Sequence, residues 1–111
     1  MTTTDGKDGE ITVIEGVATL NAQSGDTPRI EKLAAGTGAT VIRISFSAGQ
    51  TMADHQAKFP ILVQTVVGDV SFSTEERTVS LVPGTVVHLD AGIVHRLEAE
   101  IDSVVMLTIL R

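Results

Sequence analysis

Residues 61–99 have the sequence ILVQTVVGDVSFSTEERTVSLVPGTVVHLDAGIVHRLEA, a succession of short apolar segments separated by turn residues. Several of these segments alternate apolar with polar side chains, which is the period of a half-buried strand. The turn dipeptides between them are Gly68-Asp69, Pro83-Gly84 and Ala91-Gly92. The predicted strands are 61–67, 70–74, 78–82, 86–89 and 95–99. Short strands separated by about 8–12 residues, with Gly or Pro between them, are typical of a sandwich or a small barrel.

The flanking sequence extends this pattern in both directions. Residues 40–47 alternate Ile42, Ile44 and Phe46 with smaller or polar neighbours, and 104–110 and 29–34 are further candidate strands. Residues 11–20 fit a short helix about as well as a strand. The prediction is an all-β single domain: a flexible N-terminus of residues 1–10, then a barrel of six to eight strands over residues 11–111.

Composition supports the β prediction and excludes several partners. Fourteen Val, nine Ile and fourteen Thr in 111 residues favour pleated sheets over helices. Fourteen acidic residues against eight basic ones give a net charge of −6, which argues against nucleic acid and anionic membranes as partners. The absence of Cys excludes disulfides and thiolate metal sites. Without a signal pattern or an apolar membrane span, a cytoplasmic location is expected.

Histidines and glycines at regular intervals indicate a candidate site. With these spacings the chain resembles the cupin family of small jelly-roll barrels, whose motifs are G-x5-H-x-H-x3,4-E-x6-G and G-x5-P-x-G-x2-H-x3-N. The first motif covers residues 49–68 and the second 84–99. The positions in register are Gly49, His55, Gly68, Gly84, Gly92 and His95.

The same resemblance shows where this chain departs from the family. The family's two remaining metal-ligand positions, a His and a Glu, hold Ala57 and Ile61 here. Asp90 and Ala99 replace the Pro and the Asn of the second motif. The resemblance therefore implies at most one divalent transition metal (Fe, Mn, Ni, Zn or Cu), held by His55 and His95 and weakly bound or absent. A third ligand would have to come from Asp54, Asp90 or His88.

Three functional hypotheses follow from this donor set. The first is a pocket in the barrel mouth, around His55 and His95, that binds a small and perhaps anionic metabolite. The candidate ligand-binding residues are His55, His95, Gln64 and His88. The second hypothesis is a metal-dependent oxygenase or isomerase centred on the same two histidines, and the third is a non-catalytic dimeric scaffold. No catalytic residue is assigned, and whether the protein is an enzyme stays open.

The absence of Tyr and Trp narrows the functions expected for this fold. Without Tyr, the His–Tyr chemistry of the nucleotide-sugar epimerases of this fold is not expected, and without Trp or Tyr neither is stacking on sugars.

The resemblance and an apolar sheet face in so short a chain predict a homodimer, in which an N-terminal extension caps or exchanges with the partner.

Overall fold

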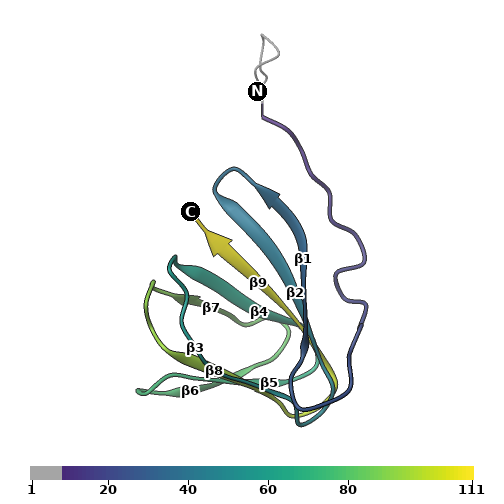
Figure 1. Ribbon diagram of the computed structural model, residues 1–111, viewed down its shortest axis with the longest axis vertical. Coiled ribbons are helices and arrows are strands. Elements are labelled where there is room, and N and C mark those ends of the chain that lie inside the picture. The colour runs from purple at the N-terminus through teal and green to yellow at the C-terminus, as the bar shows by residue number, and fades with distance from the viewer. Residues whose placement is uncertain (1–8) are drawn as a thin grey trace.

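Nine antiparallel strands make up about half of the described residues (Figure 1). The structure is a computed structural model that describes residues 9–111. This part of the chain contains no helix, and hence no helical span of a membrane. The strands are β1 (Arg29–Gly36), β2 (Ala39–Phe46), β3 (Thr51–His55), β4 (Ile61–Val67), β5 (Val70–Ser73), β6 (Thr78–Leu81), β7 (Val86–Leu89), β8 (His95–Ala99) and β9 (Ser103–Leu110).

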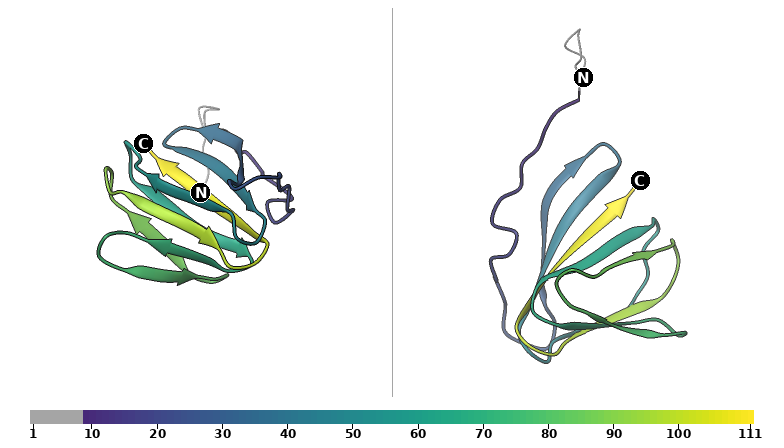
Figure 2. Two further views of the ribbon diagram at one scale, coloured as in Figure 1. Left: turned by 60° about the horizontal axis from the view of Figure 1, so that its bottom comes forward. Right: turned by 180° about the vertical axis from the view of Figure 1, so that it is seen from behind.

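The strands form two sheets that face each other (Figure 2). One sheet has five strands in the order β1-β2-β9-β4-β7, and the other has four in the order β3-β8-β5-β6. The chain passes from one sheet to the other at β2–β3, β3–β4, β4–β5, β6–β7, β7–β8 and β8–β9. This repeated crossing gives the jelly-roll arrangement and places the core between the sheets.

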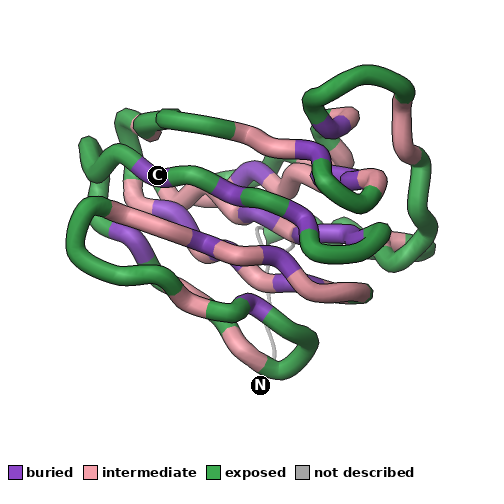
Figure 3. Tube along the Cα trace, turned by 90° about the horizontal axis from the view of Figure 1, so that it is seen from below, coloured by how far each residue is buried: buried purple, intermediate pink, exposed green. Residues whose placement is uncertain are grey.

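Alternation of side chains decides which residues enter that core (Figure 3). On β4, Ile61, Val63 and Thr65 are buried, while the residues between them are partly exposed. On β8, His95, Leu97 and Ala99 are buried and their neighbours are exposed. The buried positions of both sheets meet in one cluster, which includes Phe46, Phe72 and Leu81.

Gly68 makes the turn between β4 and β5 possible. Its φ is +100°, a conformation that L-residues rarely adopt. A Cβ at this position would lie 2.6 Å from the Asp102 carbonyl oxygen and would also clash with the Ser103 side chain. The turn therefore requires glycine for both its backbone angle and its space.

Residues preceding β1 lie against the outer surface of the five-stranded sheet. Arg43 on β2 donates hydrogen bonds from Nη1 to the Gly16 carbonyl oxygen and from Nε to Glu31, both at 3.0 Å. Asn21 donates from its backbone N–H to the Ser45 hydroxyl at 3.1 Å and from Nδ2 to Glu31 at 3.0 Å. These bonds hold the segment 16–21 against the sheet. The segment is not a strand, because it turns at residues 17–18, where the Thr19 N–H donates to the Gly16 carbonyl oxygen at 3.0 Å.

The all-β jelly-roll prediction is confirmed, with differences in detail. The observed bounds of β4, β7 and β8 coincide with the predicted strands. The predicted total of six to eight strands is wrong, because β3 was not expected and the described residues contain nine. Residues 11–20 form neither a helix nor a strand, and the first strand begins only at Arg29. Most of the flexible terminus predicted for 1–10 lies outside the described residues.

Candidate functional site

The histidines of the two motifs face each other across β3 and β8. His55 and His95 are Cα partners, and Met52 and Leu97 are the next aligned pair. Three residue steps on β3 therefore match two on β8, which is a β-bulge. Asp54 lies in this bulge with a φ of 55°, the only positive value among the described residues other than glycines. Because side chains alternate between the two faces along a strand, the extra residue places His55 on the same face of the sheet as Met52.

His95 is a buried residue with a fixed ring. Only 3% of its surface is exposed, and its Nδ1–H donates to the Ile93 carbonyl oxygen at 3.0 Å. A carbonyl oxygen only accepts, so Nδ1 carries the proton and Nε2 has the free lone pair when the ring is neutral. The ring stacks on Phe72 with centroids 5.6 Å apart and an angle of 13° between the planes.

His55 has a different environment at the exposed end of β3. It lines a cavity of about 520 Å³ beside β1 and β3. Pro28, Ile30 and Met52 form an apolar wall of this cavity, and Asp26 is its second ionisable side chain. His55 and His95 therefore lie on neighbouring strands, but one is exposed and the other is buried.

The donor set does not fit a resident metal ion. Ala57 packs against the hydrophobic core and Ile61 is a buried part of it, so the family's other two ligand positions are filled by apolar side chains. Within residues 9–111, no three His, Asp or Glu side chains are grouped so that they could hold one ion. The third donors considered from the sequence, Asp54, Asp90 and His88, are all exposed. Two histidines in unlike environments are a poor site for the divalent metals that favour imidazole.

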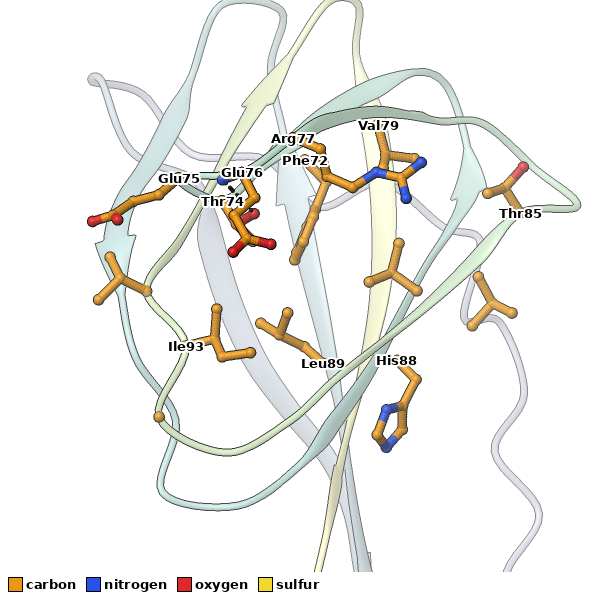
Figure 4. A pocket seen from close by; sticks show the side chains of 14 residues that line it. Phe72, Thr74, Glu75, Glu76, Arg77, Val79, Thr85, His88, Leu89 and Ile93 are labelled. Carbon is orange, nitrogen blue, oxygen red and sulfur yellow. Dashed lines mark hydrogen bonds between the residues drawn. The ribbon is translucent and has the colours of Figure 1, made fainter.

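A larger cavity lies between β7 and the hairpin of β5 and β6 (Figure 4). Its volume is about 770 Å³, within the range of small-molecule sites. The Phe72, Leu89 and Ile93 side chains point toward one another in it and form an apolar floor (Figure 4). Val79, Val87 and Val94 extend this apolar lining. Phe72 connects the cavity to His95, because one face of its ring stacks on the imidazole.

The β5–β6 turn provides the charged part of the rim. Thr74 accepts a hydrogen bond from the Glu76 backbone N–H at 3.3 Å, and its own N–H donates to the Arg77 carbonyl oxygen at 2.9 Å. Glu75, Glu76 and Arg77 thereby gather at one side of the cavity. Figure 4 shows the Arg77 guanidinium extending toward Val79 while the Glu75 carboxylate points the opposite way. Across residues 9–111, Arg77 makes no ion pair.

The opposite part of the rim is held by contacts with the β3–β4 loop. The Gly92 N–H donates to the Ala57 carbonyl oxygen at 2.9 Å, and Gln56 Nε2 donates to the Gly92 carbonyl oxygen at 2.7 Å. These bonds fix the loop that presents Ile93 and Val94, which are 39% and 42% exposed. Exposed aliphatic side chains on a tethered loop are available to cover an apolar ligand.

The two remaining candidate residues lie elsewhere on β7 and β4. His88 is at the cavity rim, but its ring points away from the cavity in Figure 4. Gln64 is aligned with Val86 and with Met106, and it alternates with the buried Val63 and Thr65. It therefore faces the outer surface of the five-stranded sheet and lines neither cavity. The residue patterns of the sequence did not indicate Arg77, Ile93 or Val94 as site residues, although the apolar pair after Gly92 is a usable signal.

Comparison with known proteins identifies the fold. No protein-family model matches the sequence, and no curated protein matches it. Among solved structures, a cupin superfamily protein from Desulfitobacterium hafniense has a TM-score of 0.72 at 16% identity, covering 81% of this chain and 83% of that one. An RmlC-like cupin from Desulfovibrio desulfuricans has a TM-score of 0.70 at 15% identity, covering 98% and 97%. KdgF from Halomonas sp. has a TM-score of 0.68 at 21% identity, covering 80% and 85%.

The chain has the cupin fold. The nine strands form a small jelly roll that matches RmlC-like cupins along almost its whole length, which confirms the fold predicted from the motif spacing. Identities of this size establish the architecture, whereas the chemistry has to be argued from the residues of this chain.

Proposed function

We propose that the protein binds a small, largely apolar metabolite that carries an anionic group, in the cavity between β7 and the β5–β6 hairpin, without a resident metal. The observation behind this proposal is a cavity of about 770 Å³ with an apolar floor and one cationic side chain at its rim. Ligand sites are commonly of this kind: an apolar volume with a few polar groups that orient the ligand.

The chemistry of the rim supports an anionic group on the ligand. Arg77 carries a fixed positive charge and presents a planar set of donors, a geometry that suits carboxylates. The guanidinium extends toward Val79 and away from the Glu75 carboxylate, so the anionic group of the ligand is expected on the Val79 side of Arg77. The expected ligand therefore has its apolar part against Phe72, Leu89 and Ile93 and its anionic end toward Arg77.

In this proposal His95 supports the binding floor instead of chelating a metal. Its ring is held by the Ile93 carbonyl oxygen and in turn supports the Phe72 ring. The hydrogen bond between His95 and the Ile93 carbonyl oxygen thereby links the cavity floor to the loop that carries Ile93. His55 belongs to the smaller cavity, and a contribution of His55 and Gln64 to ligand binding stays a prediction, as does the cytoplasmic location.

A titration with three probes that share a chain length tests the proposal. We expect octanoate to bind more tightly than octanol or octylamine and to shift the NMR signals of Phe72, Leu89 and Ile93. Replacing Ile93→Trp should fill the cavity and weaken octanoate binding by about tenfold or more. Ile101→Trp is the matched control, because Ile101 is also an exposed isoleucine but lies outside the cavity.

The charge of the rim is tested separately. Arg77→Gln should weaken octanoate about fivefold and leave octanol unchanged, since the arginine is exposed and its charge is screened. Arg96→Gln, on the outward face of β8, should change neither. Shifts confined to the His55 cavity, or no shift with any probe, would contradict the proposal. So would near-stoichiometric metal in the purified protein that is lost in a His55→Ala/His95→Ala variant.

A further inference from the structure

The two cavities of the molecule lie at different pairs of edge strands. Within residues 9–111, the five-stranded sheet ends in β1 and β7, and the four-stranded sheet ends in β3 and β6. The larger cavity lies beside β6 and β7. The cavity of about 520 Å³ lies beside β1 and β3, and its volume is also in the range of small-molecule sites.

The charge that lines the smaller cavity is opposite to that of Arg77 in the larger one. Asp26 contributes its only carboxylate, and no Arg or Lys of the described chain lines it. Arg29, which follows the cavity residue Pro28, is directed elsewhere, because its Nε donates to the Asn21 carbonyl oxygen at 3.0 Å. Within residues 9–111 the Asp26 carboxylate forms no ion pair. A ligand in this cavity is therefore expected to bring the positive charge itself.

The other polar groups of the smaller cavity can accept hydrogen bonds from an ammonium group. Thr27 and Thr51 contribute hydroxyl oxygens, and a neutral His55 ring contributes a nitrogen lone pair. A primary ammonium has three N–H donors, so it can contact the Asp26 carboxylate and two of these acceptors together. A quaternary ammonium lacks such donors and is commonly recognised by aromatic faces, yet no Phe of the described chain lines this cavity.

An uncovered apolar wall lies beside these acceptors. The register partner of Ile30 is the core residue Ile44, so Ile30 is on the inner face of its sheet, but it is 53% exposed. Pro28 and Met52 line the same cavity. An alkyl chain that covers these side chains would remove apolar surface from water. The preferred ligand therefore joins an alkyl chain to the ammonium group.

A buried amide fixes the loop that carries Asp26. Gln50 is only 4% exposed, and its Nε2 donates to the carbonyl oxygens of Gln23 at 2.8 Å and Gly25 at 3.0 Å. The Thr51 N–H donates to the Asp26 carbonyl oxygen at 3.0 Å. This wall of the cavity is therefore formed before a ligand arrives, which lowers the entropic cost of binding.

From these observations we infer that the cavity between β1 and β3 is a second binding site, which takes a small aliphatic primary amine. The ammonium group contacts Asp26, with Thr51 and His55 as further acceptors, and the alkyl chain lies against Ile30 and Met52. This site is independent of the anion site proposed for the larger cavity, because the two cavities share no lining residue.

An NMR titration with probes of one chain length tests the inference. At about pH 8, where alkylamines are charged, pentylamine should shift the signals of Ile30, Thr51 and Met52. Pentanol, pentanoate and pentyltrimethylammonium should shift them weakly or not at all. The signals of Phe72 and Ile93 report on the larger cavity in the same spectra, so the two sites are followed separately.

Two variants with matched controls locate the amine. Asp26→Asn keeps the backbone carbonyl that Thr51 contacts, and it should weaken pentylamine binding about fivefold, since the carboxylate is exposed and its charge is screened. Asp90→Asn, at an exposed Asp that lines neither cavity, should change nothing. Ile30→Trp should fill the cavity and weaken binding about tenfold, whereas Ile101→Trp, at a position 54% exposed, should not.

Several results would overturn the inference. Equal binding of pentylamine and pentanol would show that charge plays no part, and equal binding of pentyltrimethylammonium would show that N–H donors play none. Pentylamine shifts confined to Phe72 and Ile93, or no saturable shift at all, would exclude the smaller cavity as the amine site. Because octanoate is followed at the larger cavity, failure of either site leaves the test of the other intact.

Discussion

At the scale of single residues, a spacing in the sequence can mark a requirement of the fold instead of a functional group. Gly68 ends the first motif, and its importance comes from a φ of +100° and from the proximity of Asp102 and Ser103. The second histidine and the glutamate that the family places between Gly49 and Gly68 are replaced by Ala57 and Ile61, yet the turn is kept. In this chain the glycines of the motif predict the jelly roll, although two of the family's metal-ligand positions hold apolar residues.

A pair of glycine substitutions separates backbone strain from steric overlap. Gly84 also has a φ of +100°, but no atom of residues 9–111 lies within 4 Å of a Cβ built there, apart from its chain neighbours. Gly84→Ala should therefore lose about 1–2 kcal/mol of unfolding free energy from the backbone alone. Gly68→Ala should lose about 2–4 kcal/mol because the overlap adds to the strain.

Urea unfolding of both variants measures the difference. We expect both to keep the wild-type slope and to differ in midpoint, with Gly68→Ala the less stable of the two. Equal losses would mean that the Ser103 side chain and the Asp102 backbone move aside at little cost, and would refute the steric part of the argument.

At the scale of elements, a single charge cluster fixes the segment before β1 to the sheet. The Arg43 guanidinium, and after it the Asn21 amide, hold the pKa of Glu31 below its ordinary value of 4.5. A carboxyl pKa that is lower in the attached state stabilises that state. The stabilisation is fully present above the pKa of the group in the unfolded chain, and it is lost as the pH falls through its pKa in the folded chain. Attachment of the segment should therefore weaken only in acid, below about pH 4.5.

An NMR titration of the Glu31 carboxyl tests this expectation. In the wild type its midpoint should lie below 4.5, and the signals of Gly16 and Asn21 should change with the same midpoint. Arg43→Gln should move the midpoint upward toward 4.5, whereas Arg77→Gln, on a distant turn, should not. A Glu31 midpoint that is unaffected by Arg43→Gln would show that the ion pair does not hold the segment.

The alternation of apolar and polar side chains predicted the bounds of a strand correctly where a clear turn flanks the strand. The bounds of β4, β7 and β8 follow from buried apolar positions next to glycine or proline turns. Strand β3 was missed because Met52 is its only large apolar side chain and Asp54 interrupts its alternation. The segment 11–20 could not be assigned either, since the path of the chain at Gly16 and at the following Asn21 depends on hydrogen bonds with Arg43 and Ser45, which are distant in sequence.

The candidate site was less predictable than the strands. That His55 and His95 are partners depends on the one-residue bulge at Asp54, which composition and spacing do not reveal. The larger cavity is built from the turn 74–77, strand β7 and the loop after Gly92. Taken singly, Glu75 and Glu76 indicate a solvated turn. Only the jelly-roll topology brings them next to Phe72 and Ile93.

At the scale of the whole molecule, protection against hydrogen exchange should follow position in the sheets. Strand β9 pairs on both sides, with β2 and β4, and several of its side chains are buried. Among residues 9–111, β6 and β7 each pair with one strand only. Amides of β9 are therefore expected to exchange most slowly, and those of β6 and β7 faster, because local opening costs least at an edge.

Exchange measured by NMR with and without octanoate extends this prediction to the ligand. Octanoate should slow the amides of β6 and β7 and leave those of β1 unchanged, since β1 is also an edge strand but lies away from the larger cavity. Equal slowing of all three edges would indicate a general increase in stability and would argue against binding at that cavity.

The position of the larger cavity between the free edges of two different sheets also bears on how this protein can evolve. Its walls are β7 and the β5–β6 hairpin, which belong to separate sheets and are joined by no strand pairing with each other. A substitution in the 74–77 turn or the loop after Gly92 can widen or narrow the opening while the central pairs β2–β9 and β4–β9 keep their register. The ligand preference proposed for this cavity can therefore drift between descendants of this chain at little cost to folding, because the rim residues of the 74–77 turn and the loop after Gly92 lie outside the hydrophobic core.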